Sequence, residues 1–448
     1  MVRISPSGII RVGIKDMKIS ITSLGCSKNL VDSELILGSL TDSGHEITSQ
    51  EHAEVIVINT CGFIGDAKKE SINTILDLAQ YKKKGSCKKL IVTGCLVERY
   101  SEELKKEFPE VDHFWGTGSL LKINEVLADK KYKFKEQQLG TLYDPDSPRV
   151  RLTDSHTSYV KVSEGCSRTC SFCIIPKMRG IMRSRQVDSI YREIADMGQN
   201  GVKEINLIAQ DMTSYGRDIG TSLETLLKEL IKIDSISWIR LHYCYPWGFS
   251  DKLVNLLSAE NNLLPYIDMP IQHINDRILK LMDRKTSKSR ILSIIEKLKQ
   301  AIPHLTLRTT FIVGFPSESD DEFEELLDFV NDTKFERAGA FKYSHEEGTP
   351  SYNIDNQIDE DIKEERLERL LNIQSDISLE NNKKLIGKEF GYFVEGREDG
   401  DYFGRISTQA PEVDGLTYIR SDKKFKIGDY LQVRITEADI YNLHAEIV

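Results

Sequence analysis

Three cysteines stand close together, at Cys166, Cys170 and Cys173, directly after a strand-like segment at 158–163. Cysteine thiolates hold iron–sulfur clusters, and three of them within eight residues of one loop can converge on a single cluster. A four-iron cluster takes four ligands, so three thiolates leave one iron open to coordinate a small molecule. The alternative is a zinc knuckle, but that site needs a nearby fourth cysteine or histidine, and His156 lies before the strand.

A second set of cysteines, Cys26, Cys61 and Cys95, is spread over the N-terminal part of the chain, each just past a short apolar segment and beside a glycine. The apolar segments alternate with helical stretches, which indicates a parallel sheet, and such sheets bind ligands at the carboxyl ends of their strands. Three loops at that edge can bring three thiolates together. The alternative, unrelated buried cysteines, explains one such residue better than three. The segments are Lys18–Ser23, Glu54–Thr60 and Lys89–Thr93, and the glycines are Gly25, Gly62 and Gly94.

The composition is that of an ordinary globular protein of 448 residues, 40% hydrophobic and 29% charged. At roughly 150 residues per domain, the length suggests about three domains. The net charge of −10 gives no global attraction to nucleic acid. No apolar run approaches the ~18 residues of a membrane span, and eight cysteines are too few for a disulfide framework in a chain this long. We therefore expect a cytoplasmic protein without a membrane segment, in which Cys87 and Cys244, having no partners at ligand spacing, are ordinary buried residues.

The alternation of strands and helices predicts an α/β protein. After a turn-rich stretch at 144–148, six further strand segments alternate with helices over roughly 190 residues, which suits a partial (β/α)6 barrel better than an eightfold one. The segment 358–377, with apolar residues at three- and four-residue spacings, predicts an amphipathic connecting helix. From Gly387 onward, short strands predict a small antiparallel, OB-like β-barrel. The six central segments are Ser158–Ser163, Glu204–Ala209, Trp238–Tyr243, Tyr266–Met269, Thr306–Val313 and Ala338–Tyr343.

These patterns divide the chain into a flavodoxin-like or Rossmann-like N-terminal domain, a linker and the two barrels. The first sixteen residues carry little pattern and are treated as a dispensable extension. The expected boundaries are 17–135 for the N-terminal cluster domain, 136–157 for the linker, 158–380 for the central barrel and 381–448 for the C-terminal barrel.

The Cys-x3-Cys-x2-Cys loop resembles the signature of radical S-adenosylmethionine (SAM) enzymes. With a three-cysteine domain before it and a small β-domain after it, the chain resembles the methylthiotransferase family, in which these parts are an N-terminal cluster domain, a radical SAM core and a TRAM domain. The resemblance covers 17–448 and is strongest for the RimO branch. The runs that carry it are Ser23–Glu34 (SLGCSKNLVDSE), Ile208–Gly216 (IAQDMTSYG), Tyr343–Thr349 (YSHEEGT) and Ala410–Gly415 (APEVDG).

The resemblance implies an enzyme, a RimO-type methylthiotransferase that acts on the β-carbon of an aspartate in the small-subunit ribosomal protein S-twelve (uS12). Replacing C–H by C–S at an unactivated carbon is beyond acid–base catalysis, so cofactors must supply the reactive species. The implied cofactors are two 4Fe–4S clusters, one on each cysteine triplet, and SAM, of which one molecule serves radical generation and a second serves methyl transfer. The resemblance also implies that sulfur is delivered through the cluster on Cys26, Cys61 and Cys95. The implied partners are uS12 or the small ribosomal subunit, an electron donor and a sulfur donor, and we expect a monomer.

The resemblance also implies the site residues: Cys166, Cys170 and Cys173 are catalytic, and these three with Cys26, Cys61 and Cys95 are metal ligands. Polar residues near strand ends are further candidates for contacts with SAM or substrate, although a salt bridge or a loop hydrogen bond accounts for each equally well. These candidates are Gln210, Asp211, Arg308 and Thr310, together with Arg179, Arg183 and Arg185 after the cluster loop.

Two other functions remain open. The segment 381–448 carries ten Lys and Arg against twelve Asp and Glu, 10 − 12 = −2, whereas a domain that grips RNA phosphates should be basic. An acidic surface suits a basic ribosomal protein better than tRNA, so a MiaB-like tRNA adenosine methylthiotransferase is the alternative. A non-catalytic electron carrier is a second alternative; its clusters would be fully ligated by protein, and SAM would leave their spectra unchanged.

Overall fold

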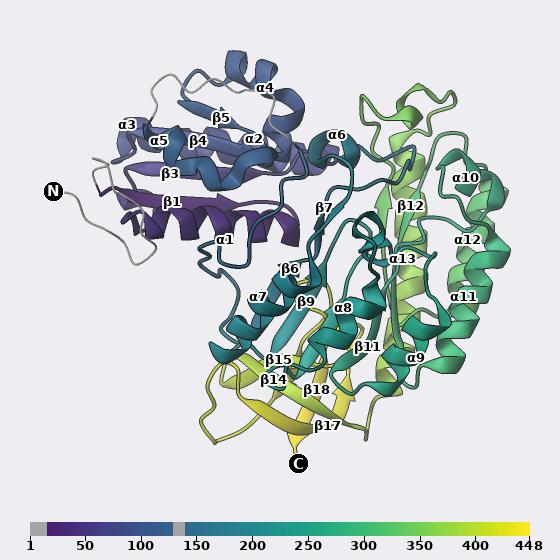
Figure 1. The fold of residues 1–448 in the computed structure, drawn as a ribbon. Coiled ribbons are helices and arrows are strands. Elements are labelled where there is room, and N and C mark those ends of the chain that lie inside the picture. The colour runs from purple at the N-terminus through teal and green to yellow at the C-terminus, as the bar shows by residue number, and fades with distance from the viewer. Residues whose placement is uncertain (1–15, 129–138) are drawn as a thin grey trace. The chain divides into compact units, whose positions relative to one another are not determined.

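The computed structural model describes residues 16–128 and 139–448 (Figure 1). The expected N-terminal extension, apart from Asp16, and the first residues of the expected linker, 136–138, lie outside this range. None of the helices found in the described ranges has the length and apolar character that a membrane span requires. The described residues form two compact units. The first consists of the chain up to Leu152 with 163–168 and 173–185, and the second of 153–162, 169–172 and 186–448.

A parallel sheet of five strands forms the centre of the first unit, in the order β2-β1-β3-β4-β5. The three strands predicted from the sequence are all present, as β1 (Lys18–Ser23), β3 (Val55–Thr60) and β4 (Lys89–Gly94). The edge strands β2 (Glu46–Ile47) and β5 (His113–Trp115) are not predicted, because two or three residues are too few to show a period of two. The unit also contains α1 (Ser27–Asp42), η1 (Gln50–His52), α2 (Gly65–Ala79), α3 (Tyr81–Lys84), α4 (Cys95–Glu107), η2 (Thr117–Lys122), α5 (Ile123–Ala128), β7 (Ser163–Glu164), α6 (Ile175–Arg179) and β8 (Arg183–Ser184).

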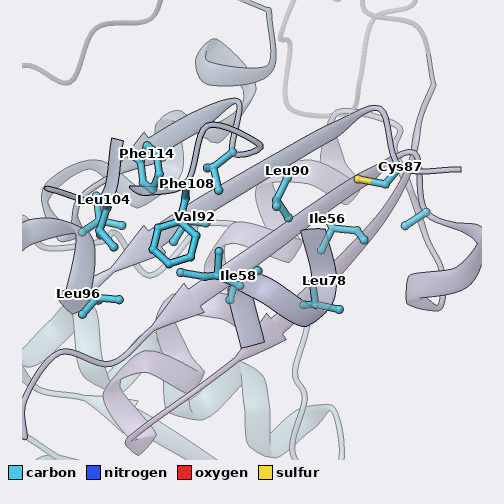
Figure 2. Packing of buried hydrophobic residues seen from close by; sticks show 14 residues of the cluster. Ile56, Ile58, Leu78, Cys87, Leu90, Val92, Leu96, Leu104, Phe108 and Phe114 are labelled. Carbon is cyan, nitrogen blue, oxygen red and sulfur yellow. The ribbon is translucent and has the colours of Figure 1, made fainter. Parts of the chain in front are cut away.

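Both faces of this sheet are covered, which is why its strands are apolar at consecutive positions. In β3, Ile56 and Ile58 belong to one layer of the core, and Val55 and Val57 belong to the other. Figure 2 shows the first of these layers, which also contains Cys87. Cys87 is thus an ordinary core residue, as predicted from the absence of other cysteines at metal-ligand spacing around it.

The second unit contains an open sheet of six parallel strands in the order β13-β12-β11-β10-β9-β6 (Figure 1, teal to green). This sheet confirms the expected partial (β/α)6 barrel. Its strands are β6 (Thr157–Lys161), β9 (Glu204–Ile208), β10 (Trp238–Leu241), β11 (Leu263–Asp268), β12 (Thr306–Val313) and β13 (Arg337–Lys342). Its helices are α7 (Val187–Gln199), η3 (Met212–Ser214), η4 (Arg217–Ile219), α8 (Leu223–Leu230), α9 (Asp251–Ala259), α10 (Asp276–Leu281), α11 (Lys288–Ala301), α12 (Asp320–Thr333), η5 (Pro350–Asn353) and α13 (Glu360–Lys383).

A closed barrel of five strands follows α13 in the same unit (Figure 1, yellow end of the chain). The strand order is β14-β15-β16-β18-β17, and the expectation of a wholly antiparallel barrel is wrong at one pair, because β16 and β18 run parallel. β18 follows β17 after a short turn and pairs with it antiparallel. The other edge of β18 closes the barrel against β16, and in this position the two strands run in the same direction. The strands are β14 (Glu389–Glu398), β15 (Asp401–Ile406), β16 (Thr417–Ile419), β17 (Tyr430–Ala438) and β18 (Leu443–Ile447).

A buried ionic cluster joins this barrel to the open sheet. Glu204, the first residue of β9, accepts hydrogen bonds from Arg405 of β15 at 2.5 and 3.1 Å and from Arg240 of β10 at 3.2 Å. All three side chains are buried. Burial alone would raise the pKa of Glu204, but the charges and hydrogen bonds of the two arginines, with Thr157, lower it to about 2.

Replacing Glu204 should therefore destabilise the second unit. Glu204→Gln is expected to lower the free energy of unfolding by about 3–5 kcal/mol at pH 7, because the buried guanidinium of Arg240 loses its counter-ion and that of Arg405 keeps only Glu395. The folded-state pKa lies below the ordinary glutamate value, so the ionic stabilisation is complete above that value and is lost as the pH falls toward 2. Urea unfolding at pH 7 and pH 3 should show a parent–variant difference that shrinks at the lower pH.

The control is Glu389→Gln, which removes a solvent-exposed pair with Arg434 and should leave the free energy of unfolding nearly unchanged. A Glu204→Gln variant as stable as this control, or a destabilisation that does not change with pH, would contradict the electrostatic account.

Candidate functional site

The N-terminal cysteines lie at the carboxyl ends of three neighbouring strands. β1, β3 and β4 are adjacent and parallel, with Ser23 paired to Asn59 and Thr60 to Gly94. The cysteines follow these strand ends within three residues: Cys26 precedes α1, Cys61 follows β3, and Cys95 begins α4. Cys26 is exposed, whereas Cys61 and Cys95 are buried. The sheet therefore brings the three loops to one edge.

Two glycines allow these loops to approach one another. Gly25 and Gly94 have φ values of +87° and +98°, in the left-handed region. A β-carbon built on Gly25 would lie 2.7 Å from the Cβ of Cys61 and 3.0 Å from its Sγ, so the loops of Cys26 and Cys61 are in direct contact. A β-carbon on Gly94 would lie 2.4 Å from the Oδ1 of Asn59. Only glycine fits at either position.

Gly25→Ala is expected to prevent cluster assembly at this edge. The alanine costs about 1–2 kcal/mol in the left-handed conformation, and its β-carbon pushes Cys61 away. After anaerobic reconstitution with iron and sulfide, the iron content per chain should fall toward about half that of the parent, because one of two clusters is lost. Gly201→Ala is the matched control, since Gly201 has a φ of +93° with no atom within 4 Å of a built β-carbon. A Gly25→Ala variant with full iron content would show that the contact is unimportant.

The chemistry of the three thiols fits a soft metal centre. Burial raises the pKa of Cys61, and it raises the pKa of Cys95 to about 12 even though Arg179 opposes this. A metal centre that binds them must therefore displace protons. Within residues 16–128 and 139–448, no three His, Cys, Asp or Glu side chains are arranged to hold a single metal ion. The thiolates of a 4Fe–4S cluster bind separate iron atoms, so they need not converge on one point.

The second triplet lies on the loop between β7 and α6. Cys166 and Cys173 belong to the first unit and Cys170 to the second. Cys166 and Cys170 are buried, and Cys173 is partly exposed. Gly165 has a φ of +75°, and a β-carbon there would lie 2.3 Å from the carbonyl oxygen of Ile181, so glycine is required where the loop begins.

Arg284 is a neighbour of Cys170 that sequence reasoning missed. Its Nη1 donates a hydrogen bond to the Sγ of Cys170 at 3.5 Å. The guanidinium lies 4.2 Å from the ring centroid of Tyr245 and also bonds to the carbonyl oxygen of Pro270. The two residues are 114 positions apart, so no local pattern could have linked them.

Two of the other candidates follow β9. Gln210 is half-buried, and Asp211 is buried. The carboxylate of Asp211 accepts hydrogen bonds from the hydroxyls of Thr213 at 2.8 Å and Ser214 at 2.6 Å. Asp211 therefore holds the first turn of η3 in place. Such a loop hydrogen bond is the alternative to a SAM contact that the sequence leaves open.

The remaining two candidates lie on β12. Arg308 pairs with Asp268 at 2.9 Å and lines a cavity of about 270 Å³ together with Asp414. The carbonyl of Thr310 accepts a hydrogen bond from the backbone N–H of Gln272 at 2.9 Å, and its side chain is half-buried. Of the four candidates, Arg308 has both a charge and an adjoining cavity.

The arginines after the cluster loop belong to the first unit. Arg179 is buried and forms ion pairs with two carboxylates of that unit. Arg185 is buried, with its guanidinium 4.1 Å from the ring centroid of Tyr143, and Arg183 lies half-buried in β8. For Arg179, the geometry favours the salt-bridge alternative over a SAM contact.

Comparison with known families covers most of the chain. Residues 18–116 match the model described as uncharacterized protein family UPF0004, residues 160–330 match the radical SAM superfamily, and residues 386–448 match the TRAM domain. The solved structure of TsrM from Kitasatospora setae, a radical SAM methyltransferase, is similar with a TM-score of 0.54 and 11% identity, covering 75% of this chain and 74% of that one. At such low identity the likeness shows the fold alone.

Curated relatives match along nearly the whole length. The ribosomal protein uS12 methylthiotransferase RimO of Geotalea uraniireducens is 47% identical over 442 residues, which covers 96% of this chain and 98% of that protein. The protein of the same name from Clostridioides difficile is 45% identical over 439 residues, covering 96% and 99%. The chain belongs to the RimO family of radical SAM methylthiotransferases.

Proposed function

We propose that this chain methylthiolates the β-carbon of an aspartate in ribosomal protein uS12. One observation carries the proposal: both cysteine triplets lie on a chain that matches uS12 methylthiotransferases over 96% of its length. The alternative of a fully ligated electron carrier is disfavoured, because each triplet is one thiolate short of a full ligand set.

The cofactors are two 4Fe–4S clusters and SAM. The residues fit them: Cys26, Cys61 and Cys95 offer sulfur donors at one sheet edge, and the second triplet offers three more on one loop. When bound, a cluster with an open iron supplies the one-electron reduction of SAM that makes chemistry at an unactivated carbon accessible. The chain's own part is to fix the thiolates, through the close approach at Gly25 and the hydrogen bond from Arg284 to Cys170.

Arg308 is the best-supported substrate contact among the candidates outside the cysteines. Its guanidinium is partly exposed beside the 270 Å³ cavity, which Glu412 and Asp414 of the C-terminal barrel also line. Gln210 and Thr310 are proposed to form hydrogen bonds with SAM. Asp211 is proposed to act indirectly, by holding η3 in place.

The proposed domains are 17–135, 158–380 and 381–448, with a linker at 136–157. A sulfur donor and an electron donor complete the proposed reaction, because sulfur insertion consumes sulfur and reductive cleavage of SAM consumes an electron in each turnover. We place the enzyme in the cytoplasm, where its ribosomal substrate is available. We propose that it acts as a monomer.

The test separates a protein substrate from tRNA. Reconstituted enzyme is incubated anaerobically with SAM, reductant and either purified uS12, small ribosomal subunits or tRNA, and the products are analysed by mass spectrometry. One methylthio group on the aspartate of uS12 and none on tRNA is the expected result, in line with the net charge of −2 on 381–448. Methylthio-adenosine in tRNA with unmodified uS12 would establish the MiaB-like alternative.

A further inference from the structure

Arg179 carries a buried charge beside the N-terminal cysteines. It is the last residue of α6, which starts two residues after Cys173, and its side chain is 2% exposed. Its Nη2 donates to the Oδ1 of Asn29 at 2.6 Å and the Oδ2 of Asp32 at 2.9 Å, and its Nη1 donates to the Oε1 of Glu164 at 3.0 Å. The guanidinium is thus held in one orientation by three partners within the first unit.

These partners lie on the wall of the N-terminal thiol site. Asn29 is in the first turn of α1, three residues after Cys26, and its Oδ1 lies 3.8 Å from the Sγ of Cys95. Met178 packs against Cys95, and the carbonyl of Met178 accepts a hydrogen bond from the hydroxyl of Thr117 at 2.8 Å. The helix after the second triplet therefore forms part of the surroundings of the first triplet.

A contribution to folding stability does not by itself explain why Arg179 is buried with its two carboxylate partners. A buried ion pair can often be replaced by apolar residues without loss of stability, because desolvation offsets the attraction between the charges. Burial would also lower the pKa of Arg179, but the charges of Cys95, Glu164 and Asp32 raise it. A fixed positive charge that interacts with a cysteine of the site is a means of tuning a metal centre.

We propose that Arg179 is a positioning residue for the N-terminal cluster, which orients Asn29 against Cys95 and raises the reduction potential of the cluster that the first triplet holds. The inference rests on the proposed function, which assigns a cluster to that triplet. A positive charge next to a cluster stabilises its reduced, more negative state, so removing the charge makes reduction harder. Asp32 has the opposite effect, because its carboxylate opposes the added electron.

The experiment isolates the N-terminal cluster in the full-length chain. The parent for the test carries Cys166→Ala, Cys170→Ala and Cys173→Ala, so only the first triplet can hold a cluster. The midpoint potential is measured by anaerobic redox titration followed by EPR, alongside iron content. Arg179→Met should shift the potential down, Arg179→Lys should shift it less, and Asp32→Asn should shift it up. A merely structural role would not produce shifts of opposite sign.

Arg149→Met is the matched control. Arg149 forms another buried ion pair in the same unit, with Glu34, two helical turns beyond Cys26, and its loss should leave the potential unchanged. Equal shifts for Arg149→Met and Arg179→Met, or no shift in Arg179→Met and Asp32→Asn, would overturn the inference. If Arg179→Met fails to fold, Asp32→Asn decides alone: an upward shift supports the inference, and no shift or a downward shift overturns it. A test parent that holds no cluster at all would overturn the assignment of a cluster to the first triplet, and this inference with it.

Discussion

Cys170→Ala is expected to abolish methylthiolation of uS12 and, with it, the cleavage of SAM. Loss of a neighbour that only orients a metal ligand costs about 10–100-fold, so loss of a ligand from a three-thiolate site should cost more than about 100-fold. The measurements are 5′-deoxyadenosine by chromatography and the mass of uS12 after single-turnover incubation. The N-terminal cluster should remain, since Cys170 belongs to the other triplet.

Cys244→Ala is the control for this variant. Cys244 is also buried in the second unit, after β10, and it has no place in either triplet. The Cys244→Ala enzyme should methylthiolate uS12 at a rate within a few fold of the parent. A Cys170→Ala enzyme that still forms 5′-deoxyadenosine at the parental rate would remove Cys170 from the proposed site.

Cys95→Ala is expected to separate the two halves of the reaction. It removes a ligand at the sheet edge of the first unit but leaves the second triplet intact, so SAM cleavage should continue while methylthiolated uS12 falls more than about 100-fold. The two products are measured in the same reaction, and their ratio is the diagnostic quantity. Simultaneous loss of both would mean that the N-terminal cysteines serve SAM cleavage as well.

Cys87→Ala provides the comparison for Cys95→Ala. Both cysteines are buried in the first unit, but Cys87 lies in the apolar layer of Figure 2 and should affect stability without changing the product ratio. A changed ratio in Cys87→Ala would indicate that disturbance of the core, not ligand loss, explains the effect.

Much of the fold could be predicted from the sequence, because most strands of the two parallel sheets are runs of four or more residues, rich in apolar side chains, that alternate with helices. β1 begins and ends at the predicted residues, and β12 does too. The edge strands β2 and β5 were too short for any periodic signal. The parallel pairing of β16 with β18 depends on how the barrel closes, which strand patterns do not encode.

The candidate site could be predicted only in part. The cysteine positions follow from spacing and from the shared edge of a parallel sheet. Arg179 and Arg284 could not be assigned, because their roles depend on contacts with residues more than a hundred positions away. Asp211 shows the converse: a polar residue at a strand end is explained by the hydroxyls of its own loop.

The central claim is that each cysteine triplet holds its own cluster, and iron and sulfide content after anaerobic reconstitution tests it most directly. The parent should bind about eight iron and eight sulfide per chain, and alanine substitution of either triplet should leave about four of each. A parent with only about four iron, or a triplet variant that keeps the full parental amount, would contradict the account.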